Sequence, residues 1–346
     1  MKVAVLGAGS WGTALASVLA QNGHDTVLWA RRASIADEIA MQHTNGAYLP
    51  KAVLPESLKA TTDLEYSLNQ AELLVLAVTS QSAAEVLLEM KPYVGSNAVF
   101  AHAIKGLDLP SKRRISEVIE DTFDGSASRI CVIAGPSHAE EVIKQMPTTI
   151  VCSGFSRSVA ETVQDALMNQ FLRVYTNPDV VGSELGGTLK NIIALGVGIA
   201  DGLEFGDNAK AALMTRGLAE MMRLGIKMGA SAMTFSGLSG VGDLIVTCTS
   251  QHSRNFRAGR LIGQGMDARG ALTRVGMVVE GVRTTKAAYQ LATDFKIEMP
   301  ITEAIYGVLF NEDAPHTAVS RLMGRERNHE IEDVVYQETM PNWQLE

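Results

Sequence analysis

The sequence has few cysteines, no long apolar run and no long run of basic residues. Its three cysteines, Cys131, Cys152 and Cys248, lie far apart without a Cys-x-x-Cys pair, and its seven histidines show no metal-ligand spacing. This pattern argues against a disulfide framework and against a zinc site, so we expect no bound metal. No stretch approaches about 20 uninterrupted apolar residues, the length that a membrane-spanning helix needs. We therefore expect no membrane insertion.

The start of the chain carries no sign of export. Its apolar run, residues 3–6, has only four residues before a glycine, whereas a secretory signal has about 7–15 apolar residues. The net charge is -8, so binding to nucleic acid or to a membrane surface has no electrostatic support. We predict a cytoplasmic protein in which any anionic ligand meets local positive charge.

The 346 residues are typical of an enzyme with two domains, because one domain usually has about 100–200 residues. In the first part of the chain, short apolar runs alternate with helical patterns. The runs occupy residues 2–6, 25–30, 72–78, 98–104, 129–135, 148–154 and 172–177. This alternation predicts an α/β Rossmann domain, with a doubly wound and mostly parallel sheet, over residues 1–177.

Strand patterns stop near Pro178 and helical patterns follow. We expect helices near residues 178–202, 208–228, 237–249, 254–264, 280–293, 300–310 and 316–324. Residues 178–325 are therefore predicted to form an all-α domain that carries substrate-binding and catalytic groups. Residues 326–346 are acidic and polar, and we interpret them as a peripheral C-terminal tail.

A glycine-rich turn follows the first apolar run. Gly7, Gly9 and Gly12 form a G-x-G-x-x-G motif between a predicted strand and a predicted helix. Glycines at these places permit a tight turn and let backbone N–H groups approach a pyrophosphate at the positive end of the helix. The position of the motif, at the first strand of the predicted sheet, predicts a dinucleotide cofactor.

The second predicted strand ends at Arg31 and Arg32, where a site for NAD usually presents an acidic residue to the adenosine ribose. A carboxylate would repel a 2'-phosphate, whereas two guanidinium groups attract it with charge-assisted hydrogen bonds. The sequence therefore favours NADP over NAD, although either arginine alone could be a solvated surface charge.

Lys190 is the only charged residue between residues 185 and 200. Its neighbours include Gly186, Gly187, Gly196 and Gly198, which indicate that a helix or a ligand packs close to this backbone. Burial lowers the pKa of a lysine toward a range in which Lys190 could donate and accept the proton of a carbonyl reduction. A nearby Asp243 or a substrate phosphate would raise this pKa, so the sequence leaves the sign of the net shift open. Asp243 is a possible partner, and the alternative is a structural lysine paired with Glu184 or Asp243.

Two further groups of residues suggest an anionic substrate. Ligands of doubly wound sheets lie at the carboxyl ends of the strands, which here present Lys105 and the segment from Gly135 to Ser137. Ser253 could cap a helix that carries Arg254 and Asn255 in its first turn. A helix N-terminus with an arginine suits a phosphate, whereas Arg257 and Arg260 could line a solvated face.

With these residues, the chain resembles the bacterial NAD(P)-dependent sn-glycerol-3-phosphate dehydrogenases over roughly residues 1–325. The matching motifs are GAGSWGTALA (7–16), WARR (29–32), NGAYLP (45–50), AIKGL (103–107), AGPSHAEEV (134–142), ELGGTLKNIIALGVGIADG (184–202), GDNAKAALMTRGLAEM (206–221), GLSGVGDLIVTC (237–248), SRNFRAGR (253–260) and VVEGV (278–282). The segment after about residue 325 is longer than the family pattern.

The resemblance implies reversible reduction of dihydroxyacetone phosphate to sn-glycerol 3-phosphate, a precursor of phospholipids, with Lys190 as proton donor and acceptor. The substrate-binding residues that it implies are Lys105, Gly135, Ser137, Lys190, Asp243, Ser253, Arg254 and Asn255. The cofactor-binding residues are the turn glycines together with Ser10, Trp11, Arg31, Arg32, Tyr48, Lys105, Ala139, Arg254, Val278 and Glu280. Tyr48, Ala139, Val278 and Glu280 rest on the resemblance alone.

Two alternatives stay open from the sequence. One is a related dehydrogenase that acts on a hydroxy or keto acid, and the other is a non-catalytic NADPH-binding regulator. The expected partners are a small phosphorylated substrate and a second copy of the chain, because closed homodimers are the commonest oligomers.

Overall fold

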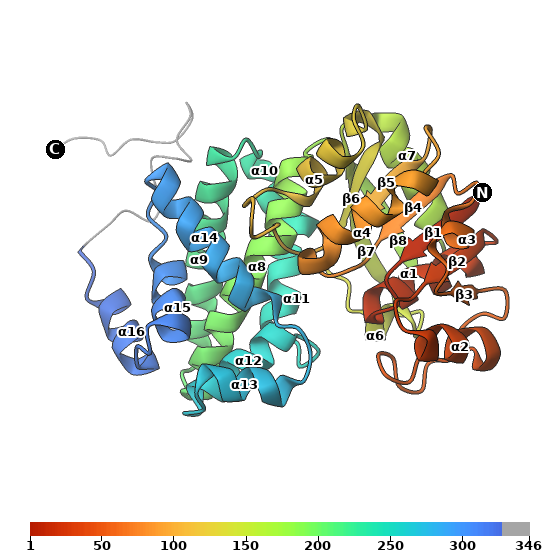
Figure 1. The fold of residues 1–346 in the computed structure, drawn as a ribbon. Helices are drawn as coiled ribbons and strands as arrows, with labels where there is room; N and C mark the ends of the chain where they lie inside the picture. The colour runs from red at the N-terminus through yellow and green to blue at the C-terminus, as the bar shows by residue number, and fades with distance from the viewer. Residues whose placement is uncertain (327–346) are drawn as a thin grey trace.

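The computed structural model describes residues 1–326, and the predicted tail over 326–346 lies outside these residues apart from its first one. The chain forms two halves, a sheet flanked by helices and a bundle of helices, with α8 at the boundary between them (Figure 1). The sheet ends with β8 at Asn177, and α8 begins at Val180. The change from strands to helices thus falls at the predicted place, while the division into two domains stays a prediction.

The sheet has eight strands in the order β3-β2-β1-β4-β5-β6-β7-β8. Their bounds are β1 Lys2–Leu6, β2 Asp25–Trp29, β3 Lys59–Thr61, β4 Leu73–Leu76, β5 Val99–His102, β6 Ile130–Ala134, β7 Thr148–Gly154 and β8 Leu172–Asn177. The short β3, which pairs with β2, was not predicted, because three residues are too few to show a period.

Helices cover both faces of the sheet. They are α1 Ser10–Gln21, α2 Ala33–Gln42, α3 Leu64–Leu68, α4 Ala83–Met90, α5 Ile115–Thr122, α6 Ala139–Val142 and α7 Arg157–Leu167. In β1, Val3 and Val5 belong to the core that includes α1, while Ala4 and Leu6 belong to the core that includes α4. Because alternate residues of a strand point to opposite faces, this split confirms the predicted doubly wound α/β class.

One strand pair is antiparallel, namely β6 with β7. A parallel connection needs a crossover of about a dozen residues, usually a helix that returns the chain to the start of the sheet. The only helix between these strands, α6, has four residues and does not return the chain to that end. The predicted sheet is therefore mostly, and not wholly, parallel.

The second half is helical, as predicted. Its helices are α8 Val180–Gly202, α9 Asp207–Lys227, α10 Ala232–Phe235, α11 Asp243–Thr249, α12 Arg254–Gly263, α13 Ala268–Val275, α14 Glu280–Phe295, α15 Pro300–Phe310 and α16 Pro315–Met323. The sequence did not predict α10 and α13. The helix expected over residues 237–249 begins with a π-helical turn, Leu238–Gly242, and only then continues as α11.

The long helix α8 is buried over almost its whole length, with α9, α10, α11, α12, α14 and α15 packed around it. It touches α12 along a row of glycines: a Cβ atom at Gly198 would overlap the carbonyl oxygen of Phe256, and one at Gly259 would overlap that of Leu195. The expected close packing is thus confirmed at Gly198. Gly187 is the exception, since nothing lies within 4 Å of an added Cβ there.

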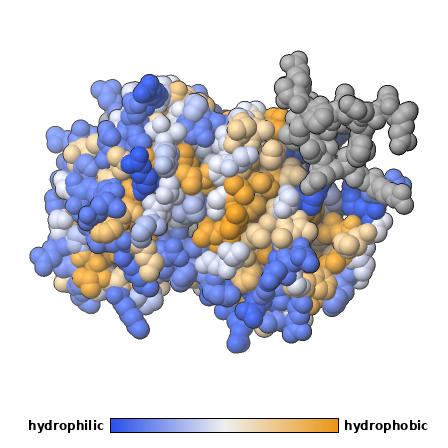
Figure 2. Space-filling view, turned by 180° about the vertical axis from the view of Figure 1, so that it is seen from behind, coloured by the Kyte–Doolittle hydropathy of each residue, from blue (hydrophilic) through white to orange (hydrophobic). Residues whose placement is uncertain are grey.

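The surface carries one larger apolar area. Seen from behind, hydrophobic residues gather near the middle of the molecule, whereas most of the surface around them is hydrophilic (Figure 2). Despite this apolar surface, none of the helices within residues 1–326 is long and apolar enough to cross a membrane.

Candidate active site

A cleft of about 1020 Å³ lies between the two halves and collects most of the predicted site residues. Those that line it are Gly7, Gly9, Ser10, Trp11, Arg31, Arg32, Tyr48, Lys105, Ser137, Ala139, Lys190, Ser253, Arg254, Asn255, Val278 and Glu280. These residues are spread over more than 270 positions of the chain, so their convergence follows from the fold. Gly12, Gly135 and Asp243 lie outside the lining.

Lys190 projects from the middle of α8 and is only 3% exposed. Its Nζ donates to Oδ1 of Asp243 and, at 2.8 Å, to Oγ1 of Thr247. Asp243 and Thr247 stand one turn apart on α11, and the Thr247 hydroxyl donates its own proton to the Asp243 carbonyl oxygen at 2.6 Å. An ammonium group has three protons, so the third is left for the cleft.

Lys105 approaches the same carboxylate from the sheet half. It follows β5, and its Nζ lies 3.5 Å from Oδ2 of Asp243. Its side chain is 25% exposed and lines the cleft, so it can reach a ligand there. Asp243 itself is buried behind the two lysines, which explains why it does not appear in the lining.

The surroundings of Lys190 shift its acidity strongly. Burial, which disfavours the charged ammonium, lowers the pKa of Lys190 to about 7, with Lys105 adding to the effect and Asp243 opposing it. The sequence left the sign of this shift open. A lysine with a pKa near neutrality can both donate and accept a proton at physiological pH.

The N-terminus of α12 forms the wall opposite the sheet. Ser253 caps the helix by accepting a hydrogen bond from the N–H of Phe256 at 3.2 Å, as predicted. Asn255 donates to Oδ1 of Asn191 on α8 at 2.9 Å and accepts from the N–H of Gly281 at 2.8 Å. Asn255 therefore ties α12 to α8 and α14, which leaves less of its side chain for a ligand.

Arg254, the first residue of α12, lines the cleft, and burial lowers the pKa of its guanidinium. Glu280, at the start of α14, accepts from the Ser80 hydroxyl at 3.1 Å, and burial raises its pKa. The cleft thus holds a partly buried cation at a helix N-terminus, which is an arrangement suited to a phosphate.

The glycine-rich turn closes the other end of the cleft. Gly7 has a φ of +113°, and an added Cβ would lie 2.8 Å from the carbonyl oxygen of Ala77, so only glycine fits there. Beside Gly9 the space is open, since no atom lies within 4 Å of an added Cβ. No side chain of residues 1–326 caps the N-terminus of α1. Its free N–H groups and the open space fit the pyrophosphate of a dinucleotide.

Gly12 and Gly135 support the cleft from behind. A Cβ at Gly12 would overlap the carbonyl oxygen of Gly7, so this glycine permits the turn. Gly135 has a φ of +111° and lies directly after β6, where Ser137 donates to its carbonyl oxygen at 2.9 Å. Gly135 therefore shapes the loop that places Ser137 in the lining.

The two arginines after β2 have protein partners. Arg31 pairs with Glu85 at 3.2 Å, and both side chains are about 60% exposed. Arg32 donates to the Tyr48 hydroxyl at 3.0 Å and lies over the Tyr48 ring. Ser10 in turn donates to the Tyr48 carbonyl oxygen at 3.0 Å, so Tyr48 links the glycine turn to Arg32.

Sequence reasoning missed two residues of the site. Thr247 was not selected, although its position four residues after Asp243 places both on one face of a helix. Arg257 lines the cleft with a buried Nε that has no hydrogen-bond partner among the described residues, whereas Arg260 pairs with Asp201 at 3.4 Å outside it. The three-residue spacing from Arg254 was the signal for Arg257.

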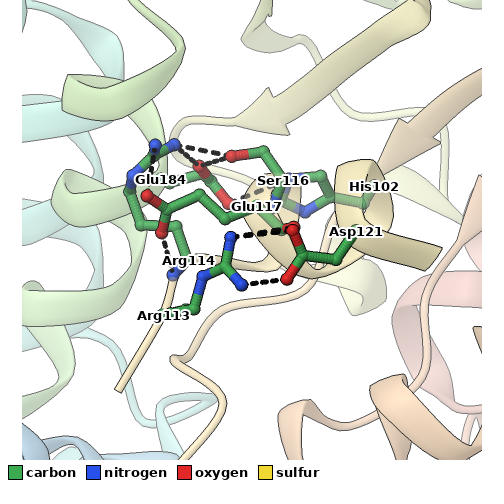
Figure 3. A network of polar contacts seen from close by, with 7 residues as sticks. All are labelled: His102, Arg113, Arg114, Ser116, Glu117, Asp121 and Glu184. Carbon is green, nitrogen blue, oxygen red and sulfur yellow. Dashed lines mark hydrogen bonds and ion pairs between the residues drawn. The ribbon is translucent and has the colours of Figure 1, made fainter. Parts of the chain in front are cut away.

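Glu184 does not pair with Lys190, which was one of the structural alternatives. It turns to the sheet half, where it contacts His102, Arg114 and Ser116 (Figure 3). Asp243 is therefore the carboxylate that pairs with Lys190. His138 and His252 also line the cleft, with ring centroids 5.6 Å apart.

The chain matches two family models in order. Residues 2–160 match the NAD-dependent glycerol-3-phosphate dehydrogenase N-terminus, and residues 179–320 match the corresponding C-terminus. A glycerol-3-phosphate dehydrogenase of Lysinibacillus sphaericus is 54% identical over 334 residues, 96% of this chain and 99% of that protein. One from Bacillus subtilis is 54% identical over 335 residues, 96% of this chain and 97% of that protein. Both carry names that specify NAD(P) as cofactor.

The crystal structure of a glycerol-3-phosphate dehydrogenase from Coxiella burnetii shares the fold with a TM-score of 0.89 at 39% identity, over 93% of this chain and 98% of that one. Sequence and fold therefore agree along both halves. The chain is an oxidoreductase that belongs to the NAD(P)-dependent glycerol-3-phosphate dehydrogenase family.

Proposed function

We propose that the protein interconverts dihydroxyacetone phosphate and sn-glycerol 3-phosphate, with Lys190 as the acid and base. The observation that carries the proposal is the buried Lys190, held by Asp243 and Thr247 at the edge of a cleft that also contains Arg254. The names of the close relatives, which are glycerol-3-phosphate dehydrogenases, support glycerol 3-phosphate as one member of this pair.

In the direction of reduction, the reacting carbonyl becomes an alkoxide that needs a proton. When bound, the reduced nicotinamide supplies the hydride. Lys190 Nζ keeps two hydrogen bonds, to Asp243 and Thr247, and its third proton goes to the carbonyl oxygen of the substrate. In the reverse direction neutral Lys190 takes the proton of the hydroxyl group.

The substrate phosphate is assigned to Arg254 and the N-terminus of α12. Ser253 and Asn255 stand beside Arg254 and shape this end of the cleft, while Lys105 and Ser137 face it from the sheet half. A keto acid would place a smaller, planar carboxylate in this region, which offers several cations and a helix end. This charge supports a phosphate over a carboxylate.

The cofactor is assigned to the glycine turn, with the 2'-phosphate of NADP at Arg31 and Arg32. Tyr48 orients Arg32 through a hydrogen bond and a stacked ring, which prepares the guanidinium for an anion. Val278, Glu280 and Ala139 would contact the cofactor further along the cleft. NADP is therefore the proposed preference, while the family accepts NAD(P).

The decisive experiment measures oxidation of NADPH and of NADH by the purified protein with dihydroxyacetone phosphate. Lys190→Met should remove turnover while the dissociation constant for NADPH stays within about twofold, because the lysine acts on the substrate oxygen. Turnover of 2-keto acids instead would favour the hydroxy-acid alternative. Tight NADPH binding without any reduction would favour the regulator.

Three assignments go beyond the site. We propose a role in supplying glycerol 3-phosphate for glycerophospholipids, because that is where the product of this reaction is used. A cytoplasmic location and a homodimer stay predictions. Gel filtration with light scattering would decide the oligomeric state.

A further inference from the structure

A buried polar cluster joins the two halves beside the proposed active site. It consists of Glu184 on α8, His102 at the end of β5, and Arg114 and Ser116 at the start of α5, and we refer to it as the Glu184 cluster (Figure 3). We propose that Glu184 is a positioning residue for the reaction: it fixes α8 against β5 and so sets the separation of Lys190 and Lys105. This inference rests on the proposed function of both lysines.

The contacts of Glu184 use both carboxylate oxygens. Oε1 accepts from the N–H of Ser116 at 2.9 Å and lies 3.2 Å from Nε2 of His102. Oε2 accepts from the Ser116 hydroxyl at 2.5 Å and from Nη1 of Arg114 at 2.7 Å. Every one of these partners belongs to the sheet half, so the carboxylate is a direct bond between the halves.

The cluster is shielded from water, so its charged carboxylate depends on hydrogen bonds from the protein. Glu184 is 5% exposed and His102 is 0% exposed. Burial alone would raise the pKa of Glu184, but His102, Arg114 and Ser116 outweigh it and lower the pKa to about 2. A charged carboxylate at this depth persists only while its donors stay in place, so the two halves are held at one separation here.

Both ends of the cluster lead directly to the lysines. Lys190 follows Glu184 by six residues on α8, which is about 9 Å along a helix. Lys105 follows His102 by three residues in the loop after β5. The two lysines meet at Asp243, where Lys105 Nζ lies 3.5 Å from Oδ2. A shift of α8 against β5 would therefore first change the separation of Lys105 and Lys190 at Asp243.

The shift would also change the acidity of Lys190. The charged and titratable groups that face Lys190 are Asp243, Lys105, His138 and Cys248. Asp243 and Cys248 belong to α11 and would move with the helical half, whereas Lys105 and His138 would stay with the sheet. Withdrawal of the positive Lys105 would raise the pKa of Lys190, because Lys105 lowers it in the intact site.

The test variant is Glu184→Gln, which keeps the volume of the side chain and removes its charge. In either orientation its NH₂ group faces a donor, namely the N–H of Ser116 or the guanidinium of Arg114, so the cluster must open. We expect kcat/KM for dihydroxyacetone phosphate to fall by about tenfold or more, since a displacement of about 1 Å near reacting groups is costly. NADPH affinity should change by less than about twofold.

Glu220→Gln is the matched control. Glu220 is a buried carboxylate of α9, 2% exposed, that accepts from the N–H groups of Ile301 and Thr302 and does not line the cleft. Both variants lose a buried, hydrogen-bonded carboxyl group and should lower the melting temperature, although burial raises the pKa of Glu220 to about 7 while Glu184 stays charged. Only Glu184→Gln should also move the rising limb of glycerol 3-phosphate oxidation to higher pH, which a purely structural role would not do.

Arg114→Lys is the conservative variant, since it keeps a cation beside Glu184 with fewer donors, and it should give an intermediate kcat/KM. It also carries the test if Glu184→Gln does not fold. The test compares wild type, the control Glu220→Gln, and whichever cluster variant folds, Glu184→Gln or Arg114→Lys. Equal turnover per folded molecule and equal pH limbs in all three would overturn this inference but not the proposed function. A wild type that does not reduce dihydroxyacetone phosphate would overturn the proposed function and this inference with it.

Discussion

Lys105 Nζ, from the sheet half, lies 3.5 Å from Oδ2 of Asp243, from the helical half. The same carboxylate accepts a hydrogen bond from Lys190 through its other oxygen. One buried anion thus holds a lysine from each half, and it opposes the effect of burial on Lys190. Asp243 therefore controls both the place and the charge of the proposed acid.

Replacing Asp243 by Asn tests this relationship. Without the negative charge, the pKa of Lys190 should fall below its value of about 7, so that the lysine is mostly neutral at neutral pH and has no proton to give. We expect kcat for reduction of dihydroxyacetone phosphate to drop by about 100-fold or more. Steady-state kinetics measures this drop, and fluorescence titration should show unchanged NADPH binding. A variant with wild-type kcat would remove Asp243 from the site.

The pH dependence of the reaction should have opposite signs in the two directions. Reduction needs protonated Lys190, so kcat/KM should fall as the pH rises through about 7. Oxidation needs neutral Lys190, so kcat/KM should rise through the same value. His138 does not account for these limbs, because burial and the two nearby lysines lower its pKa from 6.5. Limbs of the same sign in both directions would assign the proton transfer to another group.

Arg254 and Arg260 offer a comparison within one helix. Arg254 lines the cleft, whereas Arg260 pairs with Asp201 outside it. Arg254→Met should weaken the binding of dihydroxyacetone phosphate by about 2–5 kcal/mol, seen as a higher KM, because a partly buried cation that meets a phosphate is removed. Arg260→Met should leave KM within about twofold. Equal effects of the two changes would argue against a phosphate site at the start of α12.

Much of this site could be predicted because its signals are local. Gly7, Gly9 and Arg254 lie at the ends of strands and helices, where the residue types in the sequence indicate the local backbone conformation. The pairing of Lys190 with Asp243 over Glu184 could not be predicted, because it depends on how α11 packs against α8. The direction of β7, which runs antiparallel to β6, could not be predicted for a similar reason, since an apolar run carries no mark of its direction.

Cofactor preference should depend on the arginines after β2. Arg32→Asp should raise the KM for NADPH by about tenfold or more and favour NADH, because a carboxylate there repels the 2'-phosphate and accepts from ribose hydroxyls. Tyr48→Phe is the control: it removes only the hydroxyl that accepts from Arg32, so its effect on the NADPH to NADH ratio should be smaller. An unchanged ratio in both variants would mean that the arginines face solvent when the cofactor binds.

The glycine contact between α8 and α12 gives a prediction about stability. A methyl group at Gly259 would overlap the carbonyl oxygen of Leu195, so Gly259→Ala must push the helices apart and should lower the free energy of unfolding by about 1–3 kcal/mol. Gly187→Ala is the matched change, because its added methyl meets nothing within 4 Å and alanine favours a helix. Thermal or urea unfolding should therefore show a loss for Gly259→Ala and none for Gly187→Ala. Equal changes in the two variants would contradict the assignment of the lost stability to the contact between Gly259 and Leu195.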